Sequence, residues 1–397
     1  MPNQTKPSQD PRRDPKGAVH RHFATLFARN DSAIHLLLLV QACSPPDVFS
    51  SEHLSSTDRQ IGYLVVLRAQ SGVLDGLWPG RWTIGAGLNR QMPGGMRVDF
   101  LLCPPGRNPS SSIARKSINT LHALLSFHPE SGAIVLRSTC DKPITFVNGG
   151  VGSDLTVVKE DPGADQPDSS QRTRSCVLYM GSNRLQFGQY DFTLDFVLQP
   201  DEEEEFKRER DIVVMRNHGV CPSRHLDAVP HLEHRVCWNV CLHRELSHKA
   251  PRSIHSGVRL HTGEAVAVKA LRSTREAPDR AKNELWKAAQ FGRDHEGVLG
   301  MFDSWCEHGE SPPCTFVKTF ESPDDEEEVF YSMPLAEHSF DSMPWDTIEL
   351  EERLRYFRQT LLGLTAVHDK SMIHGAISPR TLMLLLAAKP QSQGMSE

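Results

Sequence analysis

Val266-Ala267-Val268-Lys269 is a short apolar segment that ends in a lysine. It lies within residues 264–270, whose apolar and β-branched side chains predict a buried strand. Residues 279–291 follow with helical periodicity, and they place Glu284 on that helix, fifteen residues after Lys269. A second helix is predicted over residues 350–368. Strands followed by helices, without strand–helix alternation, indicate an α+β domain.

Three further segments around this strand and helix carry a recognisable pattern. Residues 295–300 read His-Glu-Gly-Val-Leu-Gly, and residues 357–368 read Phe-Arg-Gln-Thr-Leu-Leu-Gly-Leu-Thr-Ala-Val-His. Residues 374–381 read His-Gly-Ala-Ile-Ser-Pro-Arg-Thr. With Val266–Lys269, these segments resemble the V-A-I-K, H-P-N-I-V, Q-x-L-x-G-L and H-R-D-L-K-P-x-N motifs of Ser/Thr protein kinases. The resemblance implies that Lys269 and Glu284 form the pair that binds the phosphates of ATP.

The loop that starts at His374 departs from the kinase pattern at the residues that perform the chemistry. Ala376 stands where the family has the aspartate that accepts the substrate proton, and Thr381 stands where it has a metal-holding asparagine. The glycine-rich loop aligns with residues 246–254, where its glycines are replaced by Ser247, Lys249 and Arg252. We therefore assign no catalytic residue. Binding of ATP and Mg²⁺ stays open, and no cofactor is assigned.

The sequence ends at Glu397, before any D-F-G triplet. We expect only the beginning of a kinase-like large lobe, with apolar helix positions such as Leu361, Leu364 and Val367 exposed. A covering partner, a poorly folded stretch and an incomplete gene product are the three explanations that stay open.

The region from Gln60 to Val197 consists of short apolar runs separated by Gly, Pro and Asn, which predicts a β-sandwich. Residues 82–85 (Trp-Thr-Ile-Gly), 119–123 (Asn-Thr-Leu-His-Ala) and 143–149 (Pro-Ile-Thr-Phe-Val-Asn-Gly) follow in order. These segments resemble forkhead-associated (FHA) domains, which bind phosphothreonine peptides.

The FHA resemblance implies a phosphopeptide site, but the arginine and the asparagine that contact the phosphate are replaced here. The candidates that remain are Arg115, Lys116, Asn119 and Thr120, because phosphate recognition needs a cation with hydroxyl or amide donors. His122 matches a buried histidine of the family that holds neighbouring loops by hydrogen bonds.

The chain divides into five expected segments. Residues 1–58 form a largely disordered tail with one short apolar segment, and 59–199 form the FHA-like sandwich. Residues 200–236 form a charged linker, 237–386 form a partial α+β kinase-like domain, and 387–397 form a second disordered tail.

Composition limits the classes of function. The 397 residues carry a net charge of -6, so a basic footprint for nucleic acid is lacking. The longest apolar run, residues 34–40, is too short to span a membrane. Nine cysteines without regular spacing indicate reduced thiols in an intracellular protein. The kinase and FHA resemblances together imply a nuclear or cytoplasmic signalling protein that binds other proteins.

Histidines and cysteines cluster between the two predicted domains: His218, Cys221, His225, His231, His234, Cys237, Cys241 and His243. Such side chains are the usual ligands of zinc. Residues 236–242, however, have the pattern of a buried strand in which Cys237 and Cys241 are small apolar residues. We therefore predict no metal site.

An FHA domain followed by a kinase domain is the arrangement of the checkpoint-kinase group. The predicted function is a signalling scaffold with an FHA-like domain and a pseudokinase, without phosphotransfer activity. The alternative is an ATP-dependent Ser/Thr kinase that is divergent or incomplete in sequence. A decaying gene product without a stable second domain is the third hypothesis.

Overall fold

The structure is a computed structural model that describes residues 20–43, 49–52, 59–68, 80–87, 98–104, 109–148, 155–157, 172–173, 175–231, 233–249, 252–274, 279–291, 297–306 and 326–385. The expected tails before residue 20 and over 387–397 lie outside these ranges. The His295-Glu296 part of the kinase-like pattern also lies outside them. No helix among the described residues is long and apolar enough to cross a bilayer.

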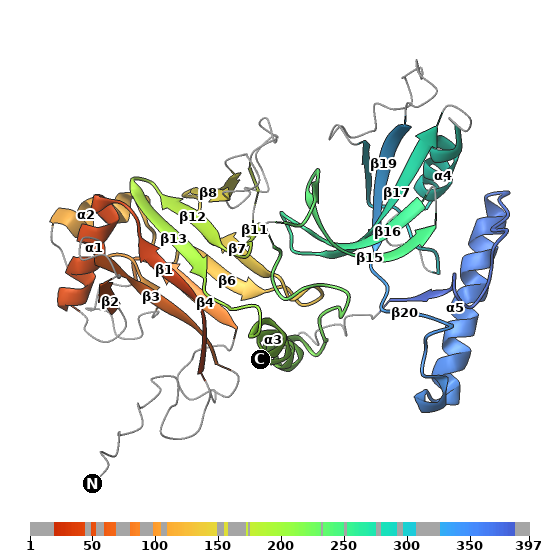
Figure 1. The fold of residues 1–397 in the computed structure, drawn as a ribbon, viewed down its shortest axis with the longest axis horizontal. Coiled ribbons are helices and arrows are strands. Elements are labelled where there is room, and N and C mark those ends of the chain that lie inside the picture. Colours follow the sequence, from red (N-terminus) through yellow and green to blue (C-terminus); the bar gives the residue numbers. More distant parts are fainter. Residues whose placement is uncertain are drawn as a thin grey trace, which may run out of the picture. The chain divides into compact units, whose positions relative to one another are not determined.

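The chain is of mixed α+β structure, is rich in sheet and forms two compact units (Figure 1). Unit 1 comprises residues 1–222, 228–233 and 260–263, and unit 2 comprises 223–227, 234–259 and 264–397.

Unit 1 contains two sheets that share one hydrophobic core. The larger sheet has the order β10 (Arg172–Thr173), β9 (Leu155–Val157), β8 (Ile144–Asn148), β12 (Ser182–Phe187), β13 (Tyr190–Phe196), β1 (His20–Ala28), β3 (Arg59–Arg68), β2 (Phe49–Glu52). The smaller has the order β11 (Ser175–Val177), β7 (Ile134–Ser138), β6 (Ala123–Phe127), β4 (Arg81–Gly85), β5 (Phe100–Leu101). Leu185 and Phe192 of the larger sheet lie in one cluster with Ile84 and Leu125 of the smaller. The predicted many-stranded sandwich is therefore present.

The first strand corrects the expectation that the chain before residue 59 is largely a disordered tail. β1 lies inside the larger sheet, where it pairs with both β13 and β3. The helix α1 (Asp31–Cys43) follows, and the side chain of Asn30 accepts a hydrogen bond from the backbone N–H of Ala33 at its start. Phe23 is buried, with its ring centroid 5.4 Å from that of Trp82. The many prolines and polar residues before His20 obscure this short apolar strand.

The helix α3 (Glu203–His218) corrects the expectation of a charged linker over 200–236. Its outer face is charged, as the sequence predicts, but four of its side chains are buried: Phe206, Arg210, Val213 and Val214. The ring of Phe206 lies 5.0 Å from that of Phe23. The buried Arg210 guanidinium donates to the carbonyl of Ala228 at 3.0 Å and pairs with Asp211. α3 is therefore part of the core of unit 1.

Unit 2 is built on a six-stranded sheet with two helices (Figure 1). Its order is β14 (Val236–Cys237), β15 (Val240–Lys249), β16 (Arg252–Arg259), β17 (Ala265–Thr274), β19 (Glu326–Pro334), β18 (Asp303–Cys306). The remaining elements are α4 (Asp279–Ala289), β20 (His338–Ser339), a 3-10 turn (Trp345–Thr347), α5 (Leu350–Asp369) and β21 (Met383–Leu384). The predicted strand over 264–270 and both predicted helices are confirmed as β17, α4 and α5.

The segment 236–242 is a tight hairpin, where the sequence predicts one buried strand. β14 pairs with β15 through Val236 opposite Cys241 and Cys237 opposite Val240. Trp238 in the turn has a φ of 54°, a left-handed conformation that is uncommon for a non-glycine residue. Cys237 and Cys241 are buried as expected. Cys237 lies opposite Val240, which is the neighbour of Cys241 on β15. Because neighbouring residues face opposite sides of a strand, Cys237 and Cys241 face opposite sides of the sheet.

Replacing Phe206 by alanine is expected to lower the free energy of unfolding of unit 1 by about 3–5 kcal/mol, because its ring is fully buried. Met215→Ala is the control on the same helix. Its side chain is 46% exposed, and the change should be about 0.5 kcal/mol or less. Urea unfolding of the full chain, followed by hydrogen exchange of peptides from β1 and β13, measures both. If both variants change the free energy of unfolding by equally small amounts, residues 200–236 would instead be the charged linker that the sequence predicts.

Candidate functional site

Arg115, the cation expected to bind a phosphate, is engaged with the protein backbone. It lies near the end of the helix α2 (Pro109–Ser117), and its guanidinium donates to the carbonyls of Ala86 and Gly87 at 3.0 Å each. The ammonium of Lys142 donates to the Arg115 carbonyl at 2.8 Å. Lys116, the neighbouring candidate, is exposed. Arg115 therefore fixes the segment after β4, and Lys116 is the cation left at the surface.

Asn119 and Thr120 lie beside the end of β4 through their backbones. Their carbonyls accept hydrogen bonds from the N–H groups of Ala86 and Gly87 at 2.8 and 3.0 Å. A Cβ placed on Gly85 would lie 2.2 Å from the Thr120 carbonyl oxygen, so only glycine permits this approach. The structure thus brings all four phosphopeptide candidates to one end of the smaller sheet. The guanidinium of Arg115 is already hydrogen-bonded to the backbone there.

His122 is fully buried, as its expected structural role requires. Its Nδ1 accepts the backbone N–H of Asn119 at 3.1 Å, and its ring meets Phe187 edge-on at 5.0 Å between centroids. Burial, followed by the nearby charge of Lys142, lowers the pKa of His122 from the usual 6.5 to about 4. The ring is therefore neutral at pH 7, and it holds the loop from β4 to β6 in place.

In unit 2, Lys269 of β17 and Glu284 of α4 form the predicted ion pair. Arg252, from the beginning of β16, reaches the other oxygen of the same carboxylate at 3.1 Å. The Tyr331 hydroxyl donates to Glu284 at 3.3 Å, and the Lys269 ammonium lies 5.8 Å from the centre of the Tyr331 ring. One carboxylate thus receives two cations and a phenol. Burial, and then the charge of Glu284, raises the pKa of Tyr331, which keeps it a donor.

Arg252 and Tyr331 are parts of this cluster that sequence reasoning did not assign. The sequence alignment places Arg252 at a glycine of the kinase loop, but it does not predict that Arg252 pairs with Glu284. The signal for Tyr331 is its register, because it lies directly opposite Lys269 on the adjacent strand β19. Neither strand pairing nor the reach of Arg252 can be derived from local sequence.

The loop 374–381 is exposed and closed by its own hydrogen bonds. The Thr381 hydroxyl donates to the carbonyl of Ala376 at 2.7 Å and accepts the N–H of Ser378 at 2.9 Å. His374 Nδ1 accepts from the Ala376 N–H at 3.4 Å, and Gly375 has a φ of 73°. Ala376 therefore presents only a methyl side chain, and the hydroxyl of Thr381 is bonded within the loop.

The helix α5 leads into this loop and is only partly covered within unit 2. The backbone of α5 at Gly363 lies directly against the backbone of Gly297, and an added Cβ on Gly363 would lie 2.1 Å from the Gly297 carbonyl oxygen. Leu354, Phe357 and Leu361 are more than half exposed. The exposure expected for Leu361 is thus observed, whereas Val367 is buried, contrary to expectation.

No protein-family model and no curated protein matches this chain. Among solved structures it is similar to the crystal structure of Rad53 1–466 in complex with AMP-PNP, with a TM-score of 0.38 and 11% sequence identity. The match covers 84% of this chain and 67% of the other. A functional assignment therefore has to come from the residues of this chain.

Unit 1 should lose stability as the pH falls from about 6.5 to about 4 because of His122. In that window the unfolded histidine binds a proton and the folded one does not, so its contribution is complete above pH 6.5 and is lost through pH 4. The total is on the order of 3 kcal/mol. A titration of the ring protons by NMR, assigned by their loss in His122→Asn, should have its midpoint near 4. A midpoint near 6.5 would contradict the buried, neutral ring.

Proposed function

We propose that this chain is a non-enzymatic signalling scaffold related to the checkpoint kinases. In this proposal residues 59–199 belong to an FHA-like domain, and residues 237–386 belong to a kinase-like domain that does not transfer phosphate. It acts inside the cell, in the nucleus or the cytoplasm, by binding other proteins.

The observation that carries the proposal is the chemistry of the loop 374–381. Phosphoryl transfer requires a group that orients the attacking hydroxyl and accepts its proton, and groups that hold the metal. The methyl side chain of Ala376 offers neither a lone pair nor a charge. Thr381 uses its hydroxyl to close the loop onto Ala376 and Ser378. A loop stabilised in this way keeps its shape without nucleotide or metal.

The ion pair of Lys269 with Glu284 also has a role that does not involve catalysis. Both side chains are mostly buried, at 16% and 18% exposed, and the carboxylate is shared with Arg252. A carboxylate satisfied from three sides fixes α4 against β16, β17 and β19. The Lys269–Glu284 pair therefore has a structural role that does not depend on ATP binding.

The expected partner is a protein. With Arg115 bonded to two carbonyls, the candidates that remain for a phosphate among the four named residues are Lys116, Asn119 and Thr120. A lysine ammonium carries a point charge and cannot form the bidentate pair of hydrogen bonds by which an arginine guanidinium binds a phosphate. We therefore expect recognition of the partner's surface rather than of a phosphothreonine alone.

The rival function is an ATP-dependent Ser/Thr kinase. The observation in its favour is the Lys269–Glu284 pair itself, which matches the phosphate-binding pair that the kinase resemblance implies. Loss of a positioned base typically costs a factor of about 10²–10⁴ in rate. Such an enzyme would thus have to supply its proton acceptor from elsewhere.

Full-length protein is expected to transfer no labelled phosphate from ATP with Mg²⁺ to a mixture of protein substrates or to itself. Ala376 cannot accept the proton, and this holds for any substrate. The measurement compares wild type with Lys269→Met, which removes the only cation of the site placed on β17. Equal incorporation at the level of the enzyme-free blank supports the scaffold. Transfer by the wild type that disappears in Lys269→Met establishes the kinase.

Phosphothreonine peptides are expected to bind the full chain no more tightly than the same peptides without phosphate. Calorimetry with matched pairs from a peptide library measures the difference. Lys116→Ala tests the exposed cation, and it serves better than Arg115→Ala, which would also release the segment after β4. A preference for phosphate of tenfold or more that is lost in Lys116→Ala would show that the sandwich reads phosphothreonine.

A further inference from the structure

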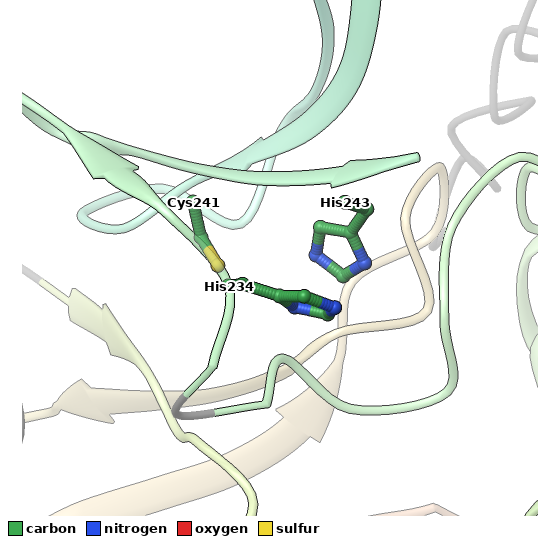
Figure 2. Close-up of side chains that lie close together, drawn as sticks. All are labelled: His234, Cys241 and His243. Carbon is green, nitrogen blue, oxygen red and sulfur yellow. The ribbon is translucent and has the colours of Figure 1, made fainter. Parts of the chain in front are cut away.

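Three potential metal ligands of unit 2 lie close together: His234, Cys241 and His243. One donor atom from each falls within 4.8 Å of the others (Figure 2). Cys241 and His243 are two residues apart on β15 and therefore face the same side of the sheet. His234 lies just before β14, the strand that pairs with β15. The hairpin thus brings His234 next to Cys241, seven positions further along the chain, and His243 follows Cys241 by two positions.

Figure 2 shows the sulfur of Cys241 and both imidazole rings turned toward one another. The ring centroids of the two histidines lie 4.5 Å apart. Cys237 cannot join this group. It pairs with Val240, which belongs to the hydrophobic cluster on the other side of the sheet together with Leu242 and Cys237 itself.

Asp227 holds the two histidines from the side opposite the cysteine. Its Oδ2 lies 3.2 Å from Nε2 of His234 and 3.3 Å from Nδ1 of His243. A carboxylate behind a ring nitrogen is the common second contact of a metal-bound histidine, because it orients the ring and fixes the tautomer. The ring nitrogens that face away from these Asp227 contacts are Nδ1 of His234 and Nε2 of His243.

The backbone N–H of Asp227 also points at Nδ1 of His243, at 3.1 Å. That nitrogen either accepts from this N–H or donates its own proton to Oδ2. A metal on Nε2 requires the second arrangement. In that arrangement Oδ2 of Asp227, 3.3 Å from Nδ1 of His243, accepts the Nδ1 proton.

Access and distance both permit an ion. The side chain of His243 is fully buried and Cys241 is buried, whereas His234 is 17% exposed and borders the solvent. Zinc bonds of about 2.0–2.3 Å in a tetrahedral site place neighbouring donors about 3.5 Å apart. Donors that lie within 4.8 Å of one another would have to approach by up to about 1.3 Å to reach that spacing.

We propose that His234, Cys241 and His243 bind a zinc ion, with Asp227 orienting the two histidines and a water molecule as the fourth ligand. Two imidazoles and a thiolate suit a borderline-soft cation, and hard cations such as Mg²⁺ prefer oxygen. Binding forms a Zn–S bond and releases the thiol proton of Cys241 to solvent.

The proposed zinc site differs from the Mg²⁺ site of a phosphoryl-transfer enzyme in its position and in its donor atoms. It lies at the β14–β15 hairpin, and it holds sulfur and nitrogen donors. It also departs from the sequence expectation of no metal. That expectation rested on a continuous strand, whereas the hairpin turn sends Cys237 and Cys241 to opposite faces.

The test is metal analysis of the full chain, purified without a histidine tag. Atomic emission should find about one zinc per chain, which a strong chelator removes. Titration of the metal-free protein with Co²⁺ should give a sulfur-to-cobalt charge-transfer band that saturates at one equivalent, with visible bands typical of four-coordinate cobalt. Cys241→Ser should abolish the charge-transfer band and lower the affinity by tenfold or more.

Cys237→Ser is the matched control, because it removes a buried thiol from the other face of the same hairpin. It should leave the cobalt spectrum and the stoichiometry unchanged. If Cys241→Ser does not fold, the wild-type titration still decides. Absence of a stoichiometric charge-transfer band in the wild type, or its persistence in folded Cys241→Ser, overturns the site and leaves a hydrogen-bonded histidine pair.

Discussion

The carboxylate of Glu284 is the contact on which unit 2 depends. It lies on α4 and receives Lys269 from β17, Arg252 from β16 and the hydroxyl of Tyr331 from β19. Three neighbouring strands and a helix are thereby joined through two oxygen atoms. A mostly buried charge is tolerated when it is paired and hydrogen-bonded in this way, and removing one side of such a pair is costly.

The loop 374–381 and the end of the smaller sheet in unit 1 share one physical character. In each, side chains placed where a ligand would be expected are used for internal contacts. Thr381 closes its own loop, and Arg115 holds the backbone at Ala86 and Gly87. Polar groups satisfied inside the protein have less to gain from a ligand, because a new contact must first replace an existing one. In both places a ligand would therefore have to displace an internal contact of Thr381 or Arg115.

Local pattern was sufficient for the elements with strong periodicity: β17, α4, α5 and the short strands of the sandwich. It failed where long-range packing decides. β1 was hidden by a polar context, and its partner β13 lies more than 160 residues away. α3 has a charged face that dominates its composition, although Phe206 and Arg210 are buried. Lys269 and Glu284 could be paired from sequence, but Arg252, Tyr331 and Asp227 depend on strand register and on a tight turn.

The most direct measurement of the central claim compares Glu284→Gln with Lys269→Met in the full chain, by urea unfolding with hydrogen exchange of α4 peptides. If the carboxylate is shared, Glu284→Gln leaves Lys269 and Arg252 without a counter-charge and costs about 3–5 kcal/mol. Lys269→Met costs clearly less than Glu284→Gln, because Arg252 and Tyr331 still contact Glu284. Equal losses in the two variants would contradict the account, since Lys269 alone would then carry the interaction.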